Sequence, residues 1–381
     1  MRIGISTSAI QRGKSGVGQY VLALVRALLE RGGGHQLVLF VLDEDLPLFA
    51  FAADDAEIVK VPERFRPALR NVWWHQATLP SLLRQRHIDV VHTPTYRRML
   101  YQAPCPRVAT IHDLAPFHIR GKYDAARMFY GRVVAKHLAL CQDEIIAISA
   151  STARDVERFF GIPASEQTVI HNGIDHTRFH PGGRDQASAE AEARWHFGAP
   201  FFLYVSRLEH PAKNHIRLIE AFNQFKSRTN SNRLLVLGGS DWHGSEFIHT
   251  AAAQSPFCGD IRFLGFVEDV RLPDLYRAAE AMVYPSLFEG FGLPPVEAMA
   301  CGCPVISSTR GSLAEVVADA VLRVEPEAVG SMAAALEQTA ADPTERLRLR
   351  EMGLRNARRF DWGVTAEQVL GVYEQAIDEF A

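Results

Sequence analysis

The sequence predicts an α/β protein of two domains, each with a doubly wound parallel sheet of the Rossmann-like type. Its 381 residues exceed what one ordinary hydrophobic core holds and suit two domains. Short runs of Val, Ile and Leu alternate with stretches of helical periodicity, as expected for parallel strands buried on both faces and joined by helices. This alternation stops at a polar stretch containing Gly and Pro, residues 176–186, and then starts again.

Each series of apolar runs predicts one sheet. In the first series we expect strands at residues 3–6, 37–42, 58–61, 90–92, 108–112, 145–149 and 168–171. The helices expected between them span residues 17–31, about 66–85, 125–140 and 151–160. In the second series we expect strands at residues 202–206, 234–237, 261–264, 281–284, 304–307 and 321–324, each followed by helical sequence.

The polar stretch sets the expected domain boundary. We assign residues 1–180 to the first domain and residues 186–361 to the second, with the two sheets facing each other across a cleft. The last helical stretch, residues 362–381, has no strand after it, and we expect it to pack back on the first domain.

Composition excludes several classes of protein. The net charge of −3 lacks the basic excess of a dedicated nucleic-acid binder. Five cysteines form no even disulfide framework, and we expect them to be reduced and buried. The start of the chain has no signal-peptide pattern, and no apolar run reaches the ~18 to 20 residues of a membrane span. We expect a cytoplasmic protein, with peripheral contact with the inner face of the membrane left open.

The segment EGFGLPPVE, residues 289–297, carries the strongest chemical signal. It follows an expected strand, and its glycines allow a ligand to approach the backbone closely. Its two prolines suit the first turn of a helix, whose free amides attract phosphate or sugar hydroxyls. Glu289 and Glu297 are placed to accept hydrogen bonds from hydroxyl groups. The alternative is a Gly/Pro-rich helix start with two solvated acids.

Two further expected strands end at polar residues that could contact a ligand. Arg207 ends the strand at 202–206, and Lys213 precedes the next helix. An arginine fork and a lysine point charge together suit a diphosphate, although an ordinary polar loop is the alternative. His112 and Asp113 end a strand of the first domain, where a ligand contact and a structural cap are both open.

Two other motifs have weaker interpretations. The stretch at residues 13–18, GKSGVG, resembles a phosphate loop, but the Walker pattern requires a glycine where the chain has Ser8. It still offers amides at a helix start. Asp43 and Asp45 form an Asp-x-Asp pair that would suit Mg²⁺, but Arg207 and Lys213 make a metal redundant, so we interpret the pair as a polar turn.

Taken together, these pieces resemble the retaining, metal-independent GT-B glycosyltransferases of family 4, also called glycosyl transferases group 1. The resemblance extends over nearly the whole chain. It rests on GVG at residues 16–18, IHD at 111–113, NGID at 172–175, SR at 206–207 with KN at 213–214, GFV at 265–267, the segment at 289–297 and GSLAEV at 311–316.

The resemblance implies roles for individual residues. Arg207 and Lys213 would neutralise the leaving diphosphate, Glu297 would bind the ribose, and Glu289 would bind the transferred sugar. The remaining contacts implied are backbone amides of Phe291, Gly292 and Leu293 for the sugar or phosphate, His112 for the sugar, Gly16 for the phosphate, and Val267 with Asp269 for the base. No metal or other cofactor is implied.

The implied reaction is a front-face substitution in which the leaving diphosphate takes the acceptor proton. The sub-patterns GVGQY, HDLAPF and GSLAEV look most like bacterial mannosyltransferases of surface-polysaccharide assembly, which favours GDP-mannose as donor and a glycan or lipid-linked oligosaccharide as acceptor. A UDP-sugar-dependent transferase, a GT-B-shaped sugar-nucleotide epimerase and a non-catalytic scaffold protein remain alternatives.

One amphipathic stretch bears on membrane contact. Trp73 and Trp74 are flanked by Arg64, Arg66, Arg70, Arg84 and Arg86. This pattern could face anionic lipid and a lipid-linked acceptor. We favour the other interpretation, a helix with both tryptophans in the core and solvated arginines.

Overall fold

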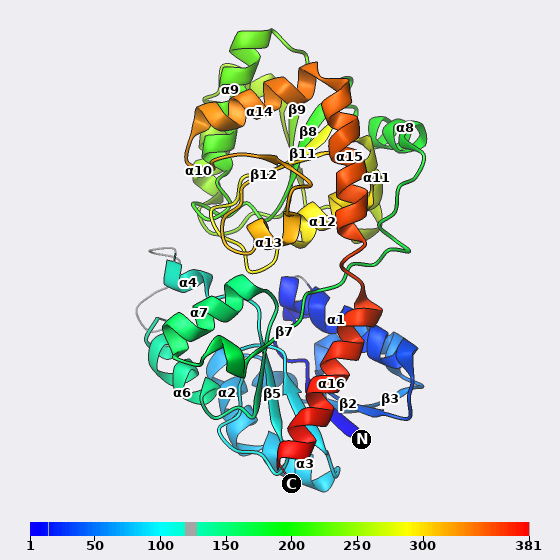
Figure 1. Cartoon of the computed structure of the whole chain (residues 1–381), viewed down its shortest axis with the longest axis vertical. Helices are drawn as coiled ribbons and strands as arrows, with labels where there is room; N and C mark the ends of the chain where they lie inside the picture. The colour runs from blue at the N-terminus through cyan, green and yellow to red at the C-terminus, as the bar shows by residue number, and fades with distance from the viewer. Residues whose placement is uncertain (14, 119–127, 381) are drawn as a thin grey trace. The chain divides into compact units, whose positions relative to one another are not determined.

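The computed structural model describes residues 1–13, 15–118 and 128–380. The chain forms two compact units: Met1–Gly173 with Phe360–Ala381, and Ile174–Arg359. Each unit contains one parallel sheet covered by helices (Figure 1). The predicted fold class, α/β with two Rossmann-like domains, is confirmed by these two sheets.

The first unit contains a seven-stranded parallel sheet in the order β3-β2-β1-β4-β5-β6-β7. Ile3 of the first strand pairs with Leu37 on one side and Val90 on the other, so this strand lies between β2 and β4. The strands are β1 (Arg2–Ser6), β2 (Gln36–Leu42), β3 (Ala56–Val61), β4 (Val90–Thr93), β5 (Arg107–Ile111), β6 (Glu144–Ala147) and β7 (Thr168–Val169).

Helices cover both faces of this sheet because successive residues of a strand point to opposite sides. Leu37 and Leu39 of β2 pack in one cluster with α1 (Gly16–Arg31) and α16 (Trp362–Phe380). Val38 and Phe40 pack in another with α2 (Ala68–Ala77) and α3 (Leu79–Gln85). The other helical segments of this unit are η1 (Gln11–Gly13), η2 (Asp43–Ala52), η3 (Glu63–Phe65), α4 (Ala115–His118), η4 (Tyr130–Ala135), α6 (Lys136–Ala139), α7 (Ala150–Phe160) and η5 (Ala164–Glu166).

Three helical segments differ from expectation. The helix expected at residues 66–85 is divided at Thr78, because Pro80 has no N–H to continue the hydrogen-bond ladder. The helix expected at residues 125–140 contains a π-helical segment, Tyr130–Ala135, and its residues 125–127 lie outside the described residues. The short helix Ala115–His118 was not expected.

The C-terminal helix α16 packs back on the first unit, as predicted. It contacts α1, β4 and β5, and it runs alongside α1 in Figure 1. Val369, Tyr373 and Ala376 are buried in the same cluster as Ile3 and Ile5 of the central strand. In the sequence, the whole second unit therefore lies between this helix and β7, the last strand of the first unit.

The second unit contains a six-stranded parallel sheet in the order β10-β9-β8-β11-β12-β13. Its strands are β8 (Phe201–Val205), β9 (Leu234–Gly238), β10 (Ile261–Gly265), β11 (Ala281–Tyr284), β12 (Val305–Ser307) and β13 (Leu322–Arg323). Its helical segments are α8 (Arg184–Trp195), α9 (His215–Thr229), α10 (Ser245–Ala253), η6 (Cys258–Asp260), η7 (Asp269–Arg271), α11 (Leu272–Ala278), α12 (Leu293–Ala300), α13 (Leu313–Val317), α14 (Val329–Ala341) and α15 (Pro343–Ala357).

The division between units falls earlier than the sequence suggested. Residues 174–180, which we assigned to the first domain, belong to the second unit. Long-range contacts explain the difference. The Phe179 ring lies 6.1 Å from that of Tyr276, and Arg277 Nε donates a 3.0 Å hydrogen bond to the carbonyl oxygen of His180.

All five cysteines are free thiols. Cys105, Cys301 and Cys303 are buried as expected, whereas Cys258 is exposed and Cys141 is half-buried, because both lie where the chain turns at the surface. Among the described residues, no helix is both long and apolar enough to cross a bilayer.

Candidate active site

The site forms at the point where the chain reverses direction across the second sheet. From β8 the chain continues to β9 and β10 on one side, and then returns to β11 on the other side of β8. Ligands of open α/β sheets bind in the crevice outside the carboxyl ends of two such strands. Arg207 and Lys213 follow β8, and Glu289 and Glu297 follow β11, so all four come after the carboxyl ends of two neighbouring strands.

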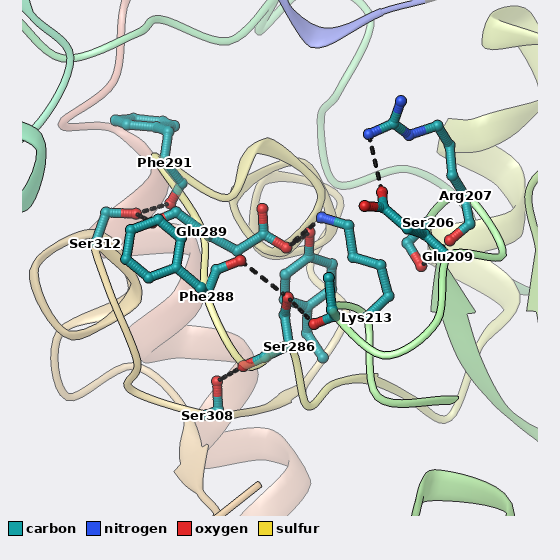
Figure 2. A network of polar contacts seen from close by, with 12 residues as sticks. Ser206, Arg207, Glu209, Lys213, Ser286, Phe288, Glu289, Phe291, Ser308 and Ser312 are labelled. Carbon is teal, nitrogen blue, oxygen red and sulfur yellow. Dashed lines mark hydrogen bonds and ion pairs between the residues drawn. The ribbon is translucent and has the colours of Figure 1, made fainter. Parts of the chain in front are cut away.

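Lys213 and Glu289 form a direct ion pair. Lys213 Nζ lies 2.6 Å from Glu289 Oε1 (Figure 2). The Tyr284 hydroxyl donates to the same oxygen at 2.9 Å. Burial alone would raise the pKa of Glu289, but the charge and hydrogen bond of Lys213, helped by hydrogen bonds from Ser286 and Tyr284, outweigh it and lower the pKa. Glu289 is therefore a carboxylate that accepts hydrogen bonds, and it is not a general acid at neutral pH.

Arg207 is oriented by two neighbours. Its Nη2 lies 3.1 Å from Glu209 Oε2, and its guanidinium lies 4.9 Å from the ring centroid of Trp242. The side chain is still 41% exposed, which leaves room for a diphosphate beside it. Figure 2 shows Arg207 and Glu209 next to the Lys213–Glu289 pair. Glu209 and Trp242 were not predicted from the sequence because neither belongs to a recognisable motif.

The loop that carries Glu289 is fixed by the motif GSLAEV. Ser312 Oγ donates to the carbonyl oxygens of Glu289 at 3.0 Å and of Phe291 at 2.9 Å. Gly311 has φ of 64°, and a Cβ there would lie 2.6 Å from the Glu289 carbonyl oxygen. Gly292 has φ of 98°, and a Cβ there would lie 2.6 Å from Leu313. These contacts explain why glycine and serine stand at these positions.

The backbone amides expected to contact the sugar or phosphate lie at the start of α12. Phe291 and Gly292 precede its first residue, Leu293. The first four N–H groups of a helix have no partner within the helix, and the next two residues of α12 are prolines, which have no N–H. The amides that this helix start leaves without an intrahelical partner thus all belong to the segment that was predicted to bind a ligand.

Glu297 occupies a different environment from Glu289. Burial raises the pKa of Glu297 to about 7, against the opposing effects of Arg178 and of a 3.1 Å hydrogen bond from the Tyr276 hydroxyl, and Asp269 raises it further. The carboxyl group is therefore only partly ionised at neutral pH. Donor hydroxyl groups would favour its ionised form. Arg178 was not predicted from the sequence as a site residue.

The two residues expected near a base follow β10. Asp269 begins η7, its side chain is 48% exposed, and it lies 3.9 Å from Arg178 Nη1. The Val267 side chain is buried, and a Cβ at Gly238 would lie 3.3 Å from its Cγ2. The side chain of Val267 is thus part of the core, and only its backbone is available for a base.

Gly16 and His112 lie at the carboxyl edge of the first unit's sheet. Gly16 is the first residue of α1, Ser15 caps this helix by accepting from Gly18 N at 3.0 Å, and a Cβ at Gly16 would meet no atom within 4 Å. Gly18, in contrast, is required for packing, since a Cβ there would lie 2.5 Å from the Ile10 carbonyl oxygen. Lys14 lies outside the described residues.

His112 is a neutral ring with a defined tautomer. Burial lowers its pKa to about 4, and its Nε2 lies 3.1 Å from the Pro94 carbonyl oxygen. A carbonyl oxygen only accepts, so Nε2 carries the proton and Nδ1 can accept a hydrogen bond from a hydroxyl group. The ring packs edge-on against Tyr20 at 4.6 Å. Its contact with a sugar stays a prediction.

The Asp43–Asp45 pair is engaged within the protein. Asp45 is fully buried, and its Oδ1 lies 3.1 Å from Arg66 Nη2. Asp43 accepts a 3.2 Å hydrogen bond from the amide of Glu63. These contacts agree with the interpretation as a polar turn.

Comparisons with known proteins assign this fold to a family. The family pattern described as Glycosyltransferase Family 4 matches residues 14–178, and the pattern described as Glycosyl transferases group 1 matches residues 186–356. The O-antigen chain mannosyltransferase B of Escherichia coli is 28% identical over 398 aligned positions that cover 98% of this chain and 100% of that protein.

A second relative and a solved structure extend the comparison. The D-inositol 3-phosphate glycosyltransferase of Kribbella flavida is 31% identical over 350 residues, covering 89% of this chain and 78% of that protein. The structure of Anabaena Alr3699/HepE in complex with UDP and glucose superposes with a TM-score of 0.77 at 20% identity, covering 98% of this chain and 100% of that chain. At this identity the structural likeness shows a shared fold.

Fold and family patterns together define a GT-B glycosyltransferase. The chain belongs to glycosyltransferase family 4, the glycosyl transferases group 1, and it is similar to the bacterial O-antigen mannosyltransferase.

Proposed function

We propose that this glycosyltransferase transfers mannose from GDP-mannose, with retention of configuration, to a hydroxyl group of a glycan or lipid-linked oligosaccharide. The observation that carries the proposal is the position of Arg207 and Lys213 beside Glu289 at the crevice of the second sheet. Two cations suit a diphosphate, and an adjacent carboxylate suits sugar hydroxyls. The likeness to the O-antigen mannosyltransferase over the whole chain favours mannose.

The ion pair suggests how a donor would be received. A diphosphate entering the crevice would share Lys213 with Glu289, which leaves Glu289 able to accept hydrogen bonds from the sugar. In the transfer step, the bond from the anomeric carbon to the phosphate oxygen breaks, and the acceptor oxygen bonds to the same face. The acceptor proton passes to the leaving phosphate oxygen. Arg207 and Lys213 would stabilise the negative charge that develops there.

We further propose that the reaction needs no bound metal. The charge that Mg²⁺ would otherwise balance is matched by Arg207 and Lys213. The Asp43–Asp45 pair, the one acidic motif singled out for a metal in the sequence, is engaged with Arg66 and Glu63.

Two other functions fit the same site. The structure of HepE in complex with UDP and glucose keeps a UDP-sugar donor open. A GT-B-shaped epimerase would use the same diphosphate site but would release free nucleotide without an acceptor. Dependence of turnover on added acceptor separates a transferase from an epimerase.

Peripheral membrane contact through α2 is a further part of the proposal. The structure corrects the interpretation that both tryptophans are core residues: Trp74 is buried, whereas Trp73 is 59% exposed and Leu69 is 88% exposed. Arg64 and Arg70 are exposed beside them. An apolar face flanked by arginines suits an anionic lipid surface.

The proposal is tested by thermal stabilisation of the purified protein with GDP-, UDP-, ADP- and dTDP-sugars, with and without EDTA. We expect a shift with GDP-mannose that persists in EDTA. Arg207→Ala should remove the shift and lower the rate of transfer on the order of 10²-fold. Arg228→Ala, which removes an exposed arginine of the same unit, is the matched control.

Each outcome has a defined meaning. A thermal shift that appears only with a UDP-sugar would show that the donor is a UDP-sugar and not GDP-mannose. It would remain consistent with the proposed transferase activity. A shift that requires Mg²⁺ would contradict the metal-independent reaction. Absence of any shift, or turnover without an acceptor, would contradict the proposed transferase.

A further inference from the structure

The sheet of the first unit also has a point where the chain reverses direction across it. β1 and β4 are neighbours, and the chain continues from β1 to β2 and β3 on one side and from β4 to β7 on the other. Ser8 follows β1, and the loop with Arg97 and Arg98 follows β4. These residues therefore lie where open α/β sheets bind ligands.

Hydrogen bonds to Asn71 and to the backbone of Arg97 fix the Arg98 side chain at this point of the sheet. Its Nε donates to Asn71 Oδ1, and its Nη1 donates to the Arg97 carbonyl oxygen at 2.8 Å. Asn71 is fixed in turn, since its Nδ2 donates to the Phe65 carbonyl oxygen at 2.9 Å. The Ser8 hydroxyl donates to Asn71 Oδ1 at 3.1 Å, next to the guanidinium. Within the described residues, Nη2 of Arg98 makes no hydrogen bond.

Among the residues that the structure describes, no negative charge balances Arg98. Among the described parts of the chain, no Asp or Glu forms an ion pair with it, and its hydrogen-bond partners are an amide and a backbone carbonyl. The neighbouring His75 is neutral, because burial lowers its pKa to about 3. Burial also lowers the pKa of Arg98, but a guanidinium keeps its proton in proteins.

Other arginines of the unit show how unusual this is. Arg2 and Arg86 pair with Glu57, Arg66 pairs with Asp45 at 3.1 Å, and Arg107 pairs with Asp143 at 2.9 Å. Arg98 is half-buried, as these are, yet its partners within the described residues are all neutral. Placing a charge away from water without a counter-charge costs free energy, which an anionic ligand would recover.

We propose that Arg98 and Ser8 bind a phosphate group of the acceptor, so that the acceptor is an anionic molecule. Nη2 of Arg98 supplies one hydrogen bond, and the Ser8 hydroxyl, by rotating away from Asn71, supplies another. A planar guanidinium beside a hydroxyl matches the geometry of phosphate oxygens. This inference rests on the proposed function, in which the first unit receives the acceptor. A sugar phosphate and a diphosphate that joins a glycan to a lipid both present this group.

The test uses inorganic phosphate and pyrophosphate as probes in isothermal titration. The full chain carries Arg207→Ala throughout, so that the donor site does not contribute. We expect millimolar binding that falls on the order of tenfold or more in Arg98→Gln and that weakens in Ser8→Ala. Arg98→Lys should retain part of the affinity because it keeps the charge. Arg154→Gln, an exposed arginine on α7, is the matched control.

Two controls distinguish the loss of phosphate binding from unfolding of the variant and from loss of the donor site. Thermal unfolding identifies variants that fail to fold. If Arg98→Gln is one of them, phosphate binding by Ser8→Ala still tests the proposed site. Equal phosphate binding with and without these substitutions, or no binding by the parent protein, would overturn the proposal. The thermal shift with GDP-mannose is measured with Arg98→Gln in a chain that keeps Arg207, where it should be unchanged, so failure here is distinct from failure of the donor site.

Two further probes separate the sources of phosphate. If a hexose phosphate binds more tightly than inorganic phosphate, and this binding depends on Arg98, the acceptor is a sugar phosphate. If a short-chain prenyl diphosphate shows this behaviour, the acceptor is lipid-linked. Binding of either probe that does not depend on Arg98 would contradict the site.

Discussion

At the scale of single residues, Glu297 controls how the second unit responds to pH. Its pKa is raised to about 7 by burial, and ribose hydroxyls would donate to its ionised form. Donor binding should therefore strengthen as pH rises from about 6 to 8, by about tenfold, and it should release a proton. Glu297→Gln should flatten this dependence, which titration calorimetry at several pH values measures. Glu246→Gln, at an exposed position, should leave it unchanged.

The raised pKa of Glu297 also affects the stability of the protein when no donor is bound. The folded-state pKa of about 7 exceeds the ordinary value of 4.5, so the folded state binds more protons than the unfolded state between these values. The free energy of unfolding therefore falls as pH rises through this range. At pH 8, Glu297→Gln should stabilise the empty protein on the order of 1 kcal/mol or more. A variant less stable than the parent at that pH would contradict this assignment.

At the scale of elements, a glycine after β9 supports the loop that carries Arg207. Gly239 has φ of 151°, and a Cβ there would lie 1.8 Å from the Ser206 carbonyl oxygen. Gly239→Ala should therefore displace the start of this loop, abolish the thermal shift by donor and lower the melting temperature by several degrees. Gly259→Ala is the matched control, since a Cβ there would meet no atom within 4 Å. A variant that keeps full donor binding would show that the loop tolerates the change.

The exposed face of α2 gives a second prediction at this scale. Trp73→Ser combined with Leu69→Ser should reduce co-sedimentation with vesicles of anionic phospholipid by tenfold or more, because each apolar side chain contributes about 1.5 to 3 kcal/mol when fully buried. Neutral vesicles should bind the parent protein weakly. Leu347→Ser, at an exposed leucine of the second unit, should have no effect. Equal sedimentation of all variants would exclude α2 as the contact.

At the scale of the whole molecule, the first unit depends on a helix from the far end of the chain. The Tyr373 hydroxyl lies 2.7 Å from His92 Nδ1, and the Tyr20 and Trp362 rings lie 5.7 Å apart. Removal of residues 362–381 should unfold the first unit and leave the second unit able to bind the donor. Calorimetry should then show the loss of one transition. Tyr373→Phe should cost about 1 to 3 kcal/mol, because it leaves a buried polar atom unpaired. Retention of both transitions after truncation would contradict this dependence.

The sequence by itself determined the strands, the two-domain architecture and the residues after the strands of the second unit. Parallel strands are buried on both faces and need continuous apolar runs, so their positions are local information. The carboxyl ends of such strands meet at one edge of a sheet, which is why Arg207, Lys213, Glu289 and Glu297 were recognised together. Their positions at the crevice follow from the strand order.

Only the tertiary structure decided the contacts between segments far apart in the chain. Lys213 and Glu289, which are 76 residues apart, form an ion pair because β8 and β11 are neighbours. The different exposure of Trp73 and Trp74 follows from which side of α2 faces the sheet. Likewise, Arg98 has no counter-charge among the described residues because of the segments that surround it in space. Local sequence encodes backbone conformation and the apolar runs of buried strands, whereas the exposure of a helix side chain and the pairing of charges depend on how the elements pack and on which crossovers bring two strands together.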